Sequence, residues 1–119
     1  RESAAETEPV RINLPDDDEP CCEFPPFADE HSQDASAAFG VFMKQVHAPG
    51  QIDGRSKKLM AIALSVAQRC RPCLEQHIDS ALKQGITREE IDEAAQLAIS
   101  FAGCPSMMMY REVCKSLGL

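Results

Sequence analysis

Near the middle of the chain, residues 69–77 read RCRPCLEQH. Cys70 and Cys73 are separated by two residues, and His77 follows four positions after the second cysteine. Proline is tolerated in the first turn of a helix, because the N–H that it lacks would have had no partner there, so Pro72 predicts a helix start. Residues four apart share one face of a helix. The stretch therefore predicts two sulfurs and an imidazole close together at a helix entrance.

The local charge favours a reactive thiol at this place. Cys70 falls near the expected N-cap, where backbone N–H groups and the positive end of the helix dipole favour an anion. Arg69 and Arg71 add positive charge on either side, and this also stabilises a thiolate. The two sulfurs are within reach of each other for a disulfide. Thiol–disulfide exchange needs at least two neighbouring thiols, one of which ionises readily.

Two different interpretations of the pair stay open at this point. C-x-x-C followed by a histidine resembles half of a zinc site, although structural zinc needs four ligands and usually a second cysteine pair. The chain has no second pair with this spacing. The two cysteines could also be buried small hydrophobic residues without a chemical role.

The composition indicates one all-α domain preceded by an acidic arm. Among its 119 residues the chain has one Tyr, five Phe and no Trp, while Ala, Leu, Ile and Met are plentiful, which favours helices over a β-sandwich. The net charge is −7, of which residues 1–31 carry −8 and residues 32–119 carry +1. A proline-rich acidic segment buries too little apolar surface to offset its ordering entropy. We expect an irregular arm over 1–31 and a helical domain over 32–119.

Charge and hydropathy exclude some classes of function. The nearly neutral domain lacks the basic stripe of a nucleic-acid-binding protein. A membrane span needs about 18 uninterrupted apolar residues, and no stretch of the chain approaches this length. No apolar core of a signal peptide is present. We therefore expect no nucleic-acid or membrane partner, and a cytoplasmic location.

Periodicity and capping signals predict five helices, at about residues 34–46, 54–68, 72–82, 87–102 and 107–117. The first has an apolar stripe that we expect in the core, formed by Phe39, Phe42, Met43 and Val46. Asp53 is the expected N-cap of the second helix, and Gly85 is expected in a left-handed turn after the third. Thr87 and Glu90 form a capping box at the start of the fourth helix. Ser106 is the expected cap of the last one. His47 stands beside the helix-breaking Pro49-Gly50 and is interpreted as a loop histidine without a chemical role.

From about residue 39 to 102, and on to about 110, the chain resembles the alkylhydroperoxidase D-like (carboxymuconolactone decarboxylase) family. The matching pieces are Pro49-Gly50, the helix at 57–64, Cys70-Arg71-Pro72-Cys73 with His77, the stretches at 81–82 and 85–91, Phe101-Ala102-Gly103, and Pro105. A dithiol helix followed at this spacing by a capping-box helix is a specific combination, whereas C-x-x-C alone is not.

The resemblance implies an all-α fold that assembles as trimers or hexamers, with a redox-active Cys70–Cys73 disulfide and no other cofactor. It assigns Cys73 as the exposed nucleophile, Cys70 as the residue that resolves the intermediate, and His77 as a proton relay. Local charge favours Cys70 instead, but a thiolate must be reached as well as stabilised, so we take Cys73 as the nucleophile. The expected partner is a protein or small-molecule thiol or disulfide.

One catalytic position departs from the family pattern. The family has a glutamate as general base twelve residues before the first cysteine, and this chain has Lys58 there. A protonated lysine cannot accept the thiol proton, although Lys58 could stabilise a thiolate as a cation, or act as a base if it is buried and neutral. The sequence therefore predicts a thiol–disulfide oxidoreductase with at most weak peroxidase activity.

The remaining cysteines allow a second class of function. Cys104 stands where the family commonly has glycine, and Cys114, Cys21 and Cys22 lie elsewhere in the chain. A thiol-rich site for a soft metal or metalloid could use Cys21, Cys22, Cys70 and Cys73. A carboxymuconolactone decarboxylase is a third possibility, although that reaction does not call for a dithiol. A non-catalytic scaffold also stays open, because Lys58 replaces the base.

Overall fold

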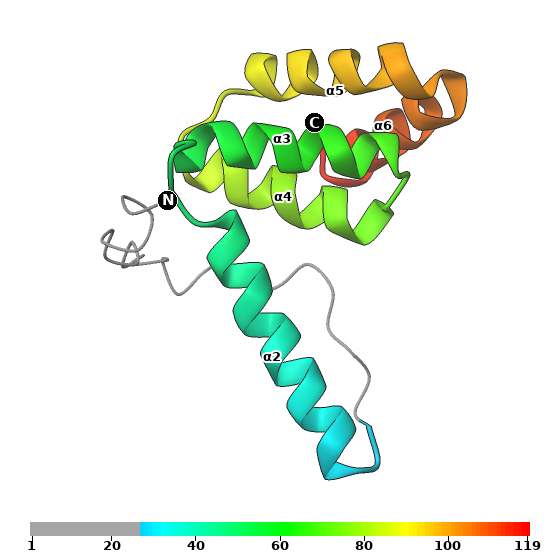
Figure 1. Cartoon of the computed structure of the whole chain (residues 1–119). Coiled ribbons are helices and arrows are strands. Elements are labelled where there is room, and N and C mark those ends of the chain that lie inside the picture. Colours follow the sequence, from blue (N-terminus) through cyan, green and yellow to red (C-terminus); the bar gives the residue numbers. More distant parts are fainter. Residues whose placement is uncertain (1–26) are drawn as a thin grey trace.

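The computed structural model describes residues 27–119, which form helices and contain no strand (Figure 1). The helices are α2 (Glu30–His47), α3 (Gly54–Ala67), α4 (Arg71–Lys83), α5 (Arg88–Ala102) and α6 (Cys104–Ser116). The expected all-α class is confirmed. Within this part of the chain, no helix has the length and apolar content needed to cross a lipid bilayer.

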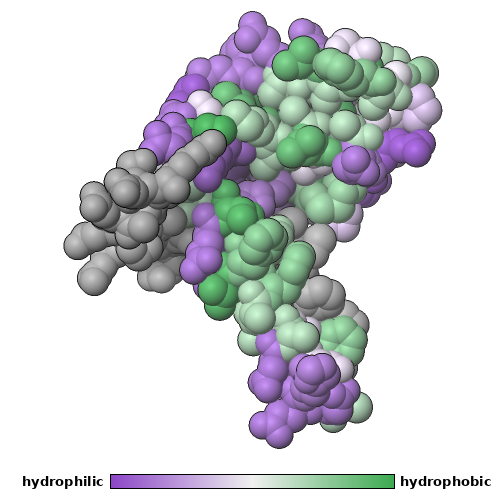
Figure 2. All heavy atoms as spheres, viewed as in Figure 1, coloured by the Kyte–Doolittle hydropathy of each residue, from purple (hydrophilic) through white to green (hydrophobic). Residues whose placement is uncertain are grey.

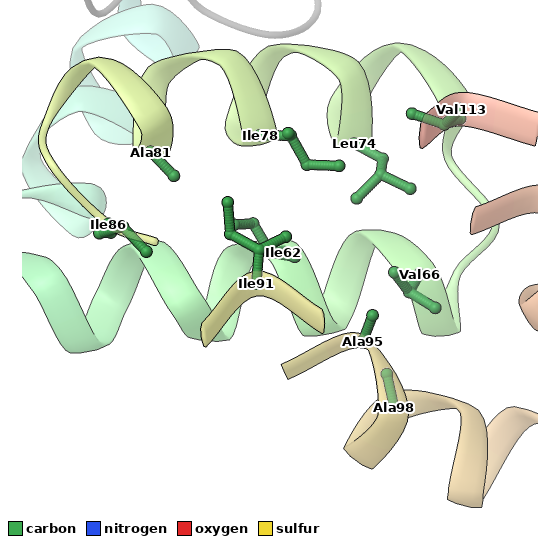
Figure 3. Packing of buried hydrophobic residues seen from close by; sticks show 10 residues of the cluster. All are labelled: Ile62, Val66, Leu74, Ile78, Ala81, Ile86, Ile91, Ala95, Ala98 and Val113. Carbon is green, nitrogen blue, oxygen red and sulfur yellow. The ribbon is translucent and has the colours of Figure 1, made fainter. Parts of the chain in front are cut away.

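Helix α3 is the centre of the packed body, because it contacts α4, α5 and α6. The side chains that these helices and the α4–α5 connection bury together are Ile62, Val66, Leu74, Ile78, Ala81, Ile86, Ile91, Ala95, Ala98 and Val113 (Figure 3). Each fully buried Leu or Ile contributes about 1.5–3 kcal/mol relative to an exposed one. The small side chains of Ala95 and Ala98 let α5 approach α3 closely. The dithiol helix α4 is thus fixed on a packed support.

The capping signals of the sequence are confirmed at three places. The Asp53 side chain accepts a hydrogen bond from the Ser56 N–H and starts α3. The capping box of Thr87 and Glu90 is formed at the start of α5. Gly85 follows α4 with φ of 86°, in the left-handed region that glycine adopts without strain.

The first described helix differs from its prediction in its start and in its burial. It begins at Glu30, where the Asp29 carboxylate accepts a hydrogen bond from the Ser32 N–H at 2.9 Å. It extends away from the body and buries none of its residues (Figure 1). Phe39, Phe42 and Val46 are 41%, 56% and 43% exposed, and hydrophobic residues cover much of this helix in Figure 2. The prediction that its stripe lies in the core was wrong, because periodicity shows an apolar face but not what covers it.

The last helix begins three residues before the predicted start. The chain turns at Gly103, whose φ is 84°, and α6 starts directly at Cys104 with Pro105 in its first turn. Ser106 is the third residue inside the helix rather than the residue before it, and its buried hydroxyl makes no capping hydrogen bond. The expected Ser106 cap was therefore wrong. A glycine turn followed by a first-turn proline replaces it.

Candidate redox site

The connection between α3 and α4 places Cys70 at the end of a tight turn. Arg69 has φ of 54°, in the left-handed region that is rare for residues other than glycine. The Cys70 N–H then donates a hydrogen bond to the Ser65 carbonyl of α3 at 3.0 Å. Cys70 is the N-cap of α4, and Pro72 lies in the first turn as its sequence predicts. Backbone contacts with α3 therefore fix the first cysteine.

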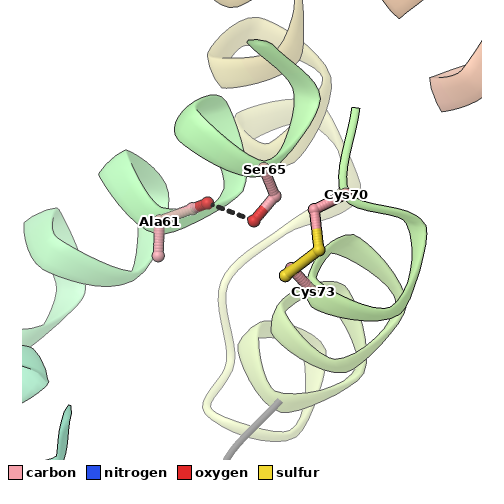
Figure 4. The surroundings of a disulfide bond; sticks show 4 residues. All are labelled: Ala61, Ser65, Cys70 and Cys73. Atoms are coloured by element: carbon pink, nitrogen blue, oxygen red, sulfur yellow. Dashed lines mark hydrogen bonds between the residues drawn. A yellow bond between two sulfur atoms is a disulfide. The ribbon is translucent and has the colours of Figure 1, made fainter. Parts of the chain in front are cut away.

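The two predicted cysteines are joined by a disulfide across the first turn of α4 (Figure 4). Their Cα atoms are 5.3 Å apart, and both residues are half-buried. Ser65 of α3 lies beside the bond, and its hydroxyl donates to the Ala61 carbonyl at 2.7 Å (Figure 4). The pair thus lies between a buried face of α3 and solvent, as a reaction with an outside molecule requires.

His77 lies one turn after Cys73 and is buried, with 9% of its surface exposed. Its Nδ1 atom is 3.4 Å from the Nζ atom of Lys58, which α3 provides. Both groups become positive on protonation, so a proton held by one disfavours a proton on the other. The residue at the family's glutamate position therefore does lie beside the histidine of the motif, with an amine instead of a carboxylate.

A second histidine contacts this one. The ring of His47, the last residue of α2, stacks on the ring of His77, with centroids 5.4 Å apart and planes inclined by 22°. The sequence alone predicts no role for His47, because thirty residues separate the two histidines. Its place between the predicted end of a helix and the Pro49-Gly50 turn is the only signal that the sequence contains.

One of the two arginines beside the cysteine pair is bound by acidic side chains, which was not predicted from the sequence. The Arg71 guanidinium binds the Glu75 carboxylate at 3.0 Å and approaches that of Glu112 at 3.9 Å. Its charge is therefore shared with two acids. Arg69 and Arg71 are both exposed.

The other two cysteines in the described part of the chain form no disulfide with the pair. Cys104 is an exposed free thiol and Cys114 a buried one, and they lie at opposite ends of α6. Cys21 and Cys22 fall outside the described residues. Within residues 27–119, no group of three or more His, Cys, Asp or Glu side chains is placed to hold a metal ion.

The sequence profile of the carboxymuconolactone decarboxylase family matches residues 33–115, and the chain belongs to this family. A solved structure of a family member from Thermotoga maritima superimposes with a TM-score of 0.65 at 27% identity, covering 68% of this chain and 84% of that one. The helical fold and the family are thus supported independently.

Curated relatives of similar sequence include proteins with and without a named activity. Uncharacterized protein 4 in the cox locus of Paracoccus denitrificans is 39% identical over 61 residues, 51% of this chain and 55% of that protein. An uncharacterized protein of Cupriavidus necator is 34% identical over 62% of this chain and 66% of its own length. Alkyl hydroperoxide reductase AhpD of Corynebacterium kroppenstedtii is 31% identical over 58% of this chain and 39% of that protein. The matches thus span between two fifths and two thirds of these relatives.

Proposed function

We propose that this protein is a thiol–disulfide oxidoreductase that alternates between a Cys70, Cys73 dithiol and the disulfide. The observation that carries the proposal is the disulfide at the first turn of α4, with His77 one turn further along the same helix. The similarity to alkyl hydroperoxide reductases supports a redox role.

The proposed exchange has two steps. The Cys73 thiolate attacks one sulfur of a substrate disulfide, so that a mixed disulfide forms and one substrate thiolate leaves. The Cys70 thiolate then attacks the Cys73 sulfur, which forms the protein disulfide and releases the second substrate thiolate. In sum the substrate gains two electrons and two protons, and the protein dithiol loses them.

Proton transfer is the task that we assign to His77 and Lys58. The neutral imidazole takes the proton from the attacking thiol and returns it to a leaving thiolate. The Lys58 ammonium, 3.4 Å from Nδ1, disfavours a lasting proton on the imidazole. His77 therefore stays available as a base, and the nearby positive charge stabilises the thiolate.

Peroxide reduction is a second candidate, favoured by the similarity to alkyl hydroperoxide reductase AhpD of Corynebacterium kroppenstedtii. In that reaction the Cys73 thiolate attacks a peroxide oxygen, the O–O bond breaks, and the alkoxide takes up a proton to leave as an alcohol. The Cys70 thiolate then attacks the Cys73 sulfenic acid, which forms the disulfide and displaces hydroxide, and the hydroxide takes up a proton to leave as water. We expect this reaction to be slow here, because Lys58 replaces a carboxylate base.

A redox titration of the full chain with trapping of intermediates tests the proposal. We expect the Cys70, Cys73 pair to titrate as one two-electron couple between about −270 and −200 mV, the range of thioredoxin and glutaredoxins. Cys70→Ser should accumulate a mixed disulfide through Cys73 with a small disulfide probe such as cystamine, whereas Cys73→Ser should not. Cys104→Ser is the matched control and should exchange like the wild type. A wild-type pair that forms no disulfide in this range would reject the function.

A further inference from the structure

We propose that His47 is a positioning residue of the dithiol site, because its ring stacks on His77 from a different helix and is anchored there by Lys57. In this role His47 holds the His77 imidazole in place and, through its own charge, sets the pH range in which His77 accepts a proton. The inference rests on the proposed exchange reaction and adds a residue to its machinery.

The first argument is the burial of His77. Only 9% of its surface is exposed, so the orientation of the ring is set by the groups that touch it. Lys58 approaches the edge of the ring at Nδ1, and the His47 ring covers a face. A proton donor and acceptor must be held within a narrow range of geometries, because small misplacements reduce the rate. His47 therefore limits movement of the His77 ring perpendicular to its plane, which a contact at the ring edge with Lys58 does not limit.

The second argument is that the chain on both sides of His47 is held in place. The Lys57 ammonium donates to the carbonyl of Val46 at 3.0 Å and to that of Ala48 at 2.7 Å. Those carbonyls belong to the residues directly before and after His47, and Ala48 is 1% exposed. A cation at the C-terminal end of α2 is also favoured by the helix dipole. One lysine of α3 thus anchors the end of a helix that otherwise extends away from the body.

The third argument is electrostatic. His47 of α2, Lys58 of α3 and His77 of α4 each become positive when they bind a proton, and Lys57 adds a further cation next to His47. Cys73, one turn before His77, is the group whose proton is to be removed. Each positive neighbour makes protonation of His77 less favourable. Protonation of His47 as the pH falls therefore helps to keep the buried imidazole neutral.

An NMR titration of the oxidised protein tests this coupling without relying on activity. The probe is the His77 ring proton signal, compared between wild type, His47→Phe and His47→Ala. We expect the midpoint of the His77 titration to rise by roughly half a pH unit in both variants, because a neighbouring positive charge is lost. His31→Phe, a histidine substitution at the exposed start of the same helix, should leave the midpoint unchanged. Unchanged midpoints in both His47 variants would overturn the proposal.

Exchange kinetics separate the position of the ring from its charge. His47→Phe keeps an aromatic ring, so we expect its maximal exchange rate to stay within about twofold of wild type while the pH profile shifts. His47→Ala removes the ring and should lower the maximal rate about tenfold, and Lys57→Met should lower it by a smaller factor. Wild-type rates and profiles in all three variants would refute the role of His47. An inactive wild type would instead reject the exchange reaction, and the NMR titration would still decide whether His47 acts on His77.

Discussion

Lys58 places an amine beside the Nδ1 atom of His77, where the family pattern has a carboxylate. An ionised carboxylate accepts protons and attracts an imidazolium, whereas an ammonium does neither. The two side chains therefore favour different protonation states of the same histidine. At this single position the chain has a cation, which favours a nearby thiolate, in place of the proton acceptor that we expect peroxide chemistry to use.

The first prediction concerns the replacement of the family's glutamate by Lys58. Lys58→Glu should raise the rate of alkyl hydroperoxide reduction by at least about tenfold, since a positioned general base contributes about 10²–10⁴-fold. The measurement is peroxide consumption at pH 7 with a dithiol reductant in excess. Lys44→Glu makes the same charge change on the exposed face of α2 and should have no effect. A Lys58→Glu rate equal to that of wild type would mean that the carboxylate is not what limits this reaction.

At the scale of elements, a hydrogen-bonded side-chain cluster connects α5 to α6. The Tyr110 hydroxyl of α6 donates to the Asp92 carboxylate of α5, which also accepts from the Arg88 Nε at 2.9 Å. Burial alone would raise the pKa of Asp92, but the hydrogen bonds from Tyr110 and Arg88 outweigh burial and lower it below 3.8. Burial, together with Asp92, raises the pKa of the Tyr110 phenol, so it remains a donor.

Tyr110→Phe should destabilise the protein by about 1 kcal/mol at pH 7, because one hydrogen bond to a partly exposed carboxylate is lost. The folded-state pKa of Asp92 is depressed, so the stabilisation is complete above 3.8 and is lost as the pH falls through the lowered value. Urea unfolding at pH 7, 5, 4 and 3 checks this, and the difference between the two proteins should shrink only at the acidic end.

Asp92→Asn is the matched control for this effect. In that background Tyr110→Phe should have a cost that does not vary with pH, because the titrating group is gone. If the loss of unfolding free energy caused by Tyr110→Phe shrinks just as steeply with falling pH in the Asp92→Asn protein, another group causes the pH dependence.

For the whole molecule, the exposed position of α2 is the feature that needs an explanation. This 18-residue helix buries none of its residues, although most helical stability in proteins comes from the packing of an apolar face. Large apolar side chains are also exposed on the body, among them Met60, Leu64, Leu97 and Phe101. Exposed apolar surface of this extent is typical of protein–protein contacts. We propose that a second copy of the chain covers α2. This proposal agrees with the homo-oligomer that we expect from the sequence.

Size-exclusion chromatography with light scattering tests this proposal. Wild type should elute with a mass of at least two chains, and the double variant Phe39→Glu/Phe42→Glu should shift toward one chain, because two charges would have to be buried in the contact. These two rings lie 6.2 Å apart on the stripe. Gln33→Glu/Gln45→Glu adds the same charge to exposed positions of α2 and should keep the wild-type mass. A monomeric wild type would contradict the proposal.

The features that sequence alone determined depend on contacts within a few residues. The Pro72 helix start, the Thr87 and Glu90 capping box and the Gly85 turn follow from local backbone chemistry, and the structure has all three. The closeness of Cys70 and Cys73 is equally local, since one helical turn joins them. The resemblance to the family also pointed to Lys58. Its spacing from Cys70 is fixed by the packing of two helices, which is a property of the fold.

Tertiary structure alone decided what covers each apolar face and which distant side chains meet. Periodicity marked the stripe of α2, but only the packing of the other helices shows that the body leaves it exposed. His47 and His77 stack at the place where Lys57 of α3 binds the carbonyls on both sides of His47. Such contacts join residues far apart in the chain, and no local propensity encodes them, whereas helix starts and the cysteine turn are set by the backbone of the residues that form them.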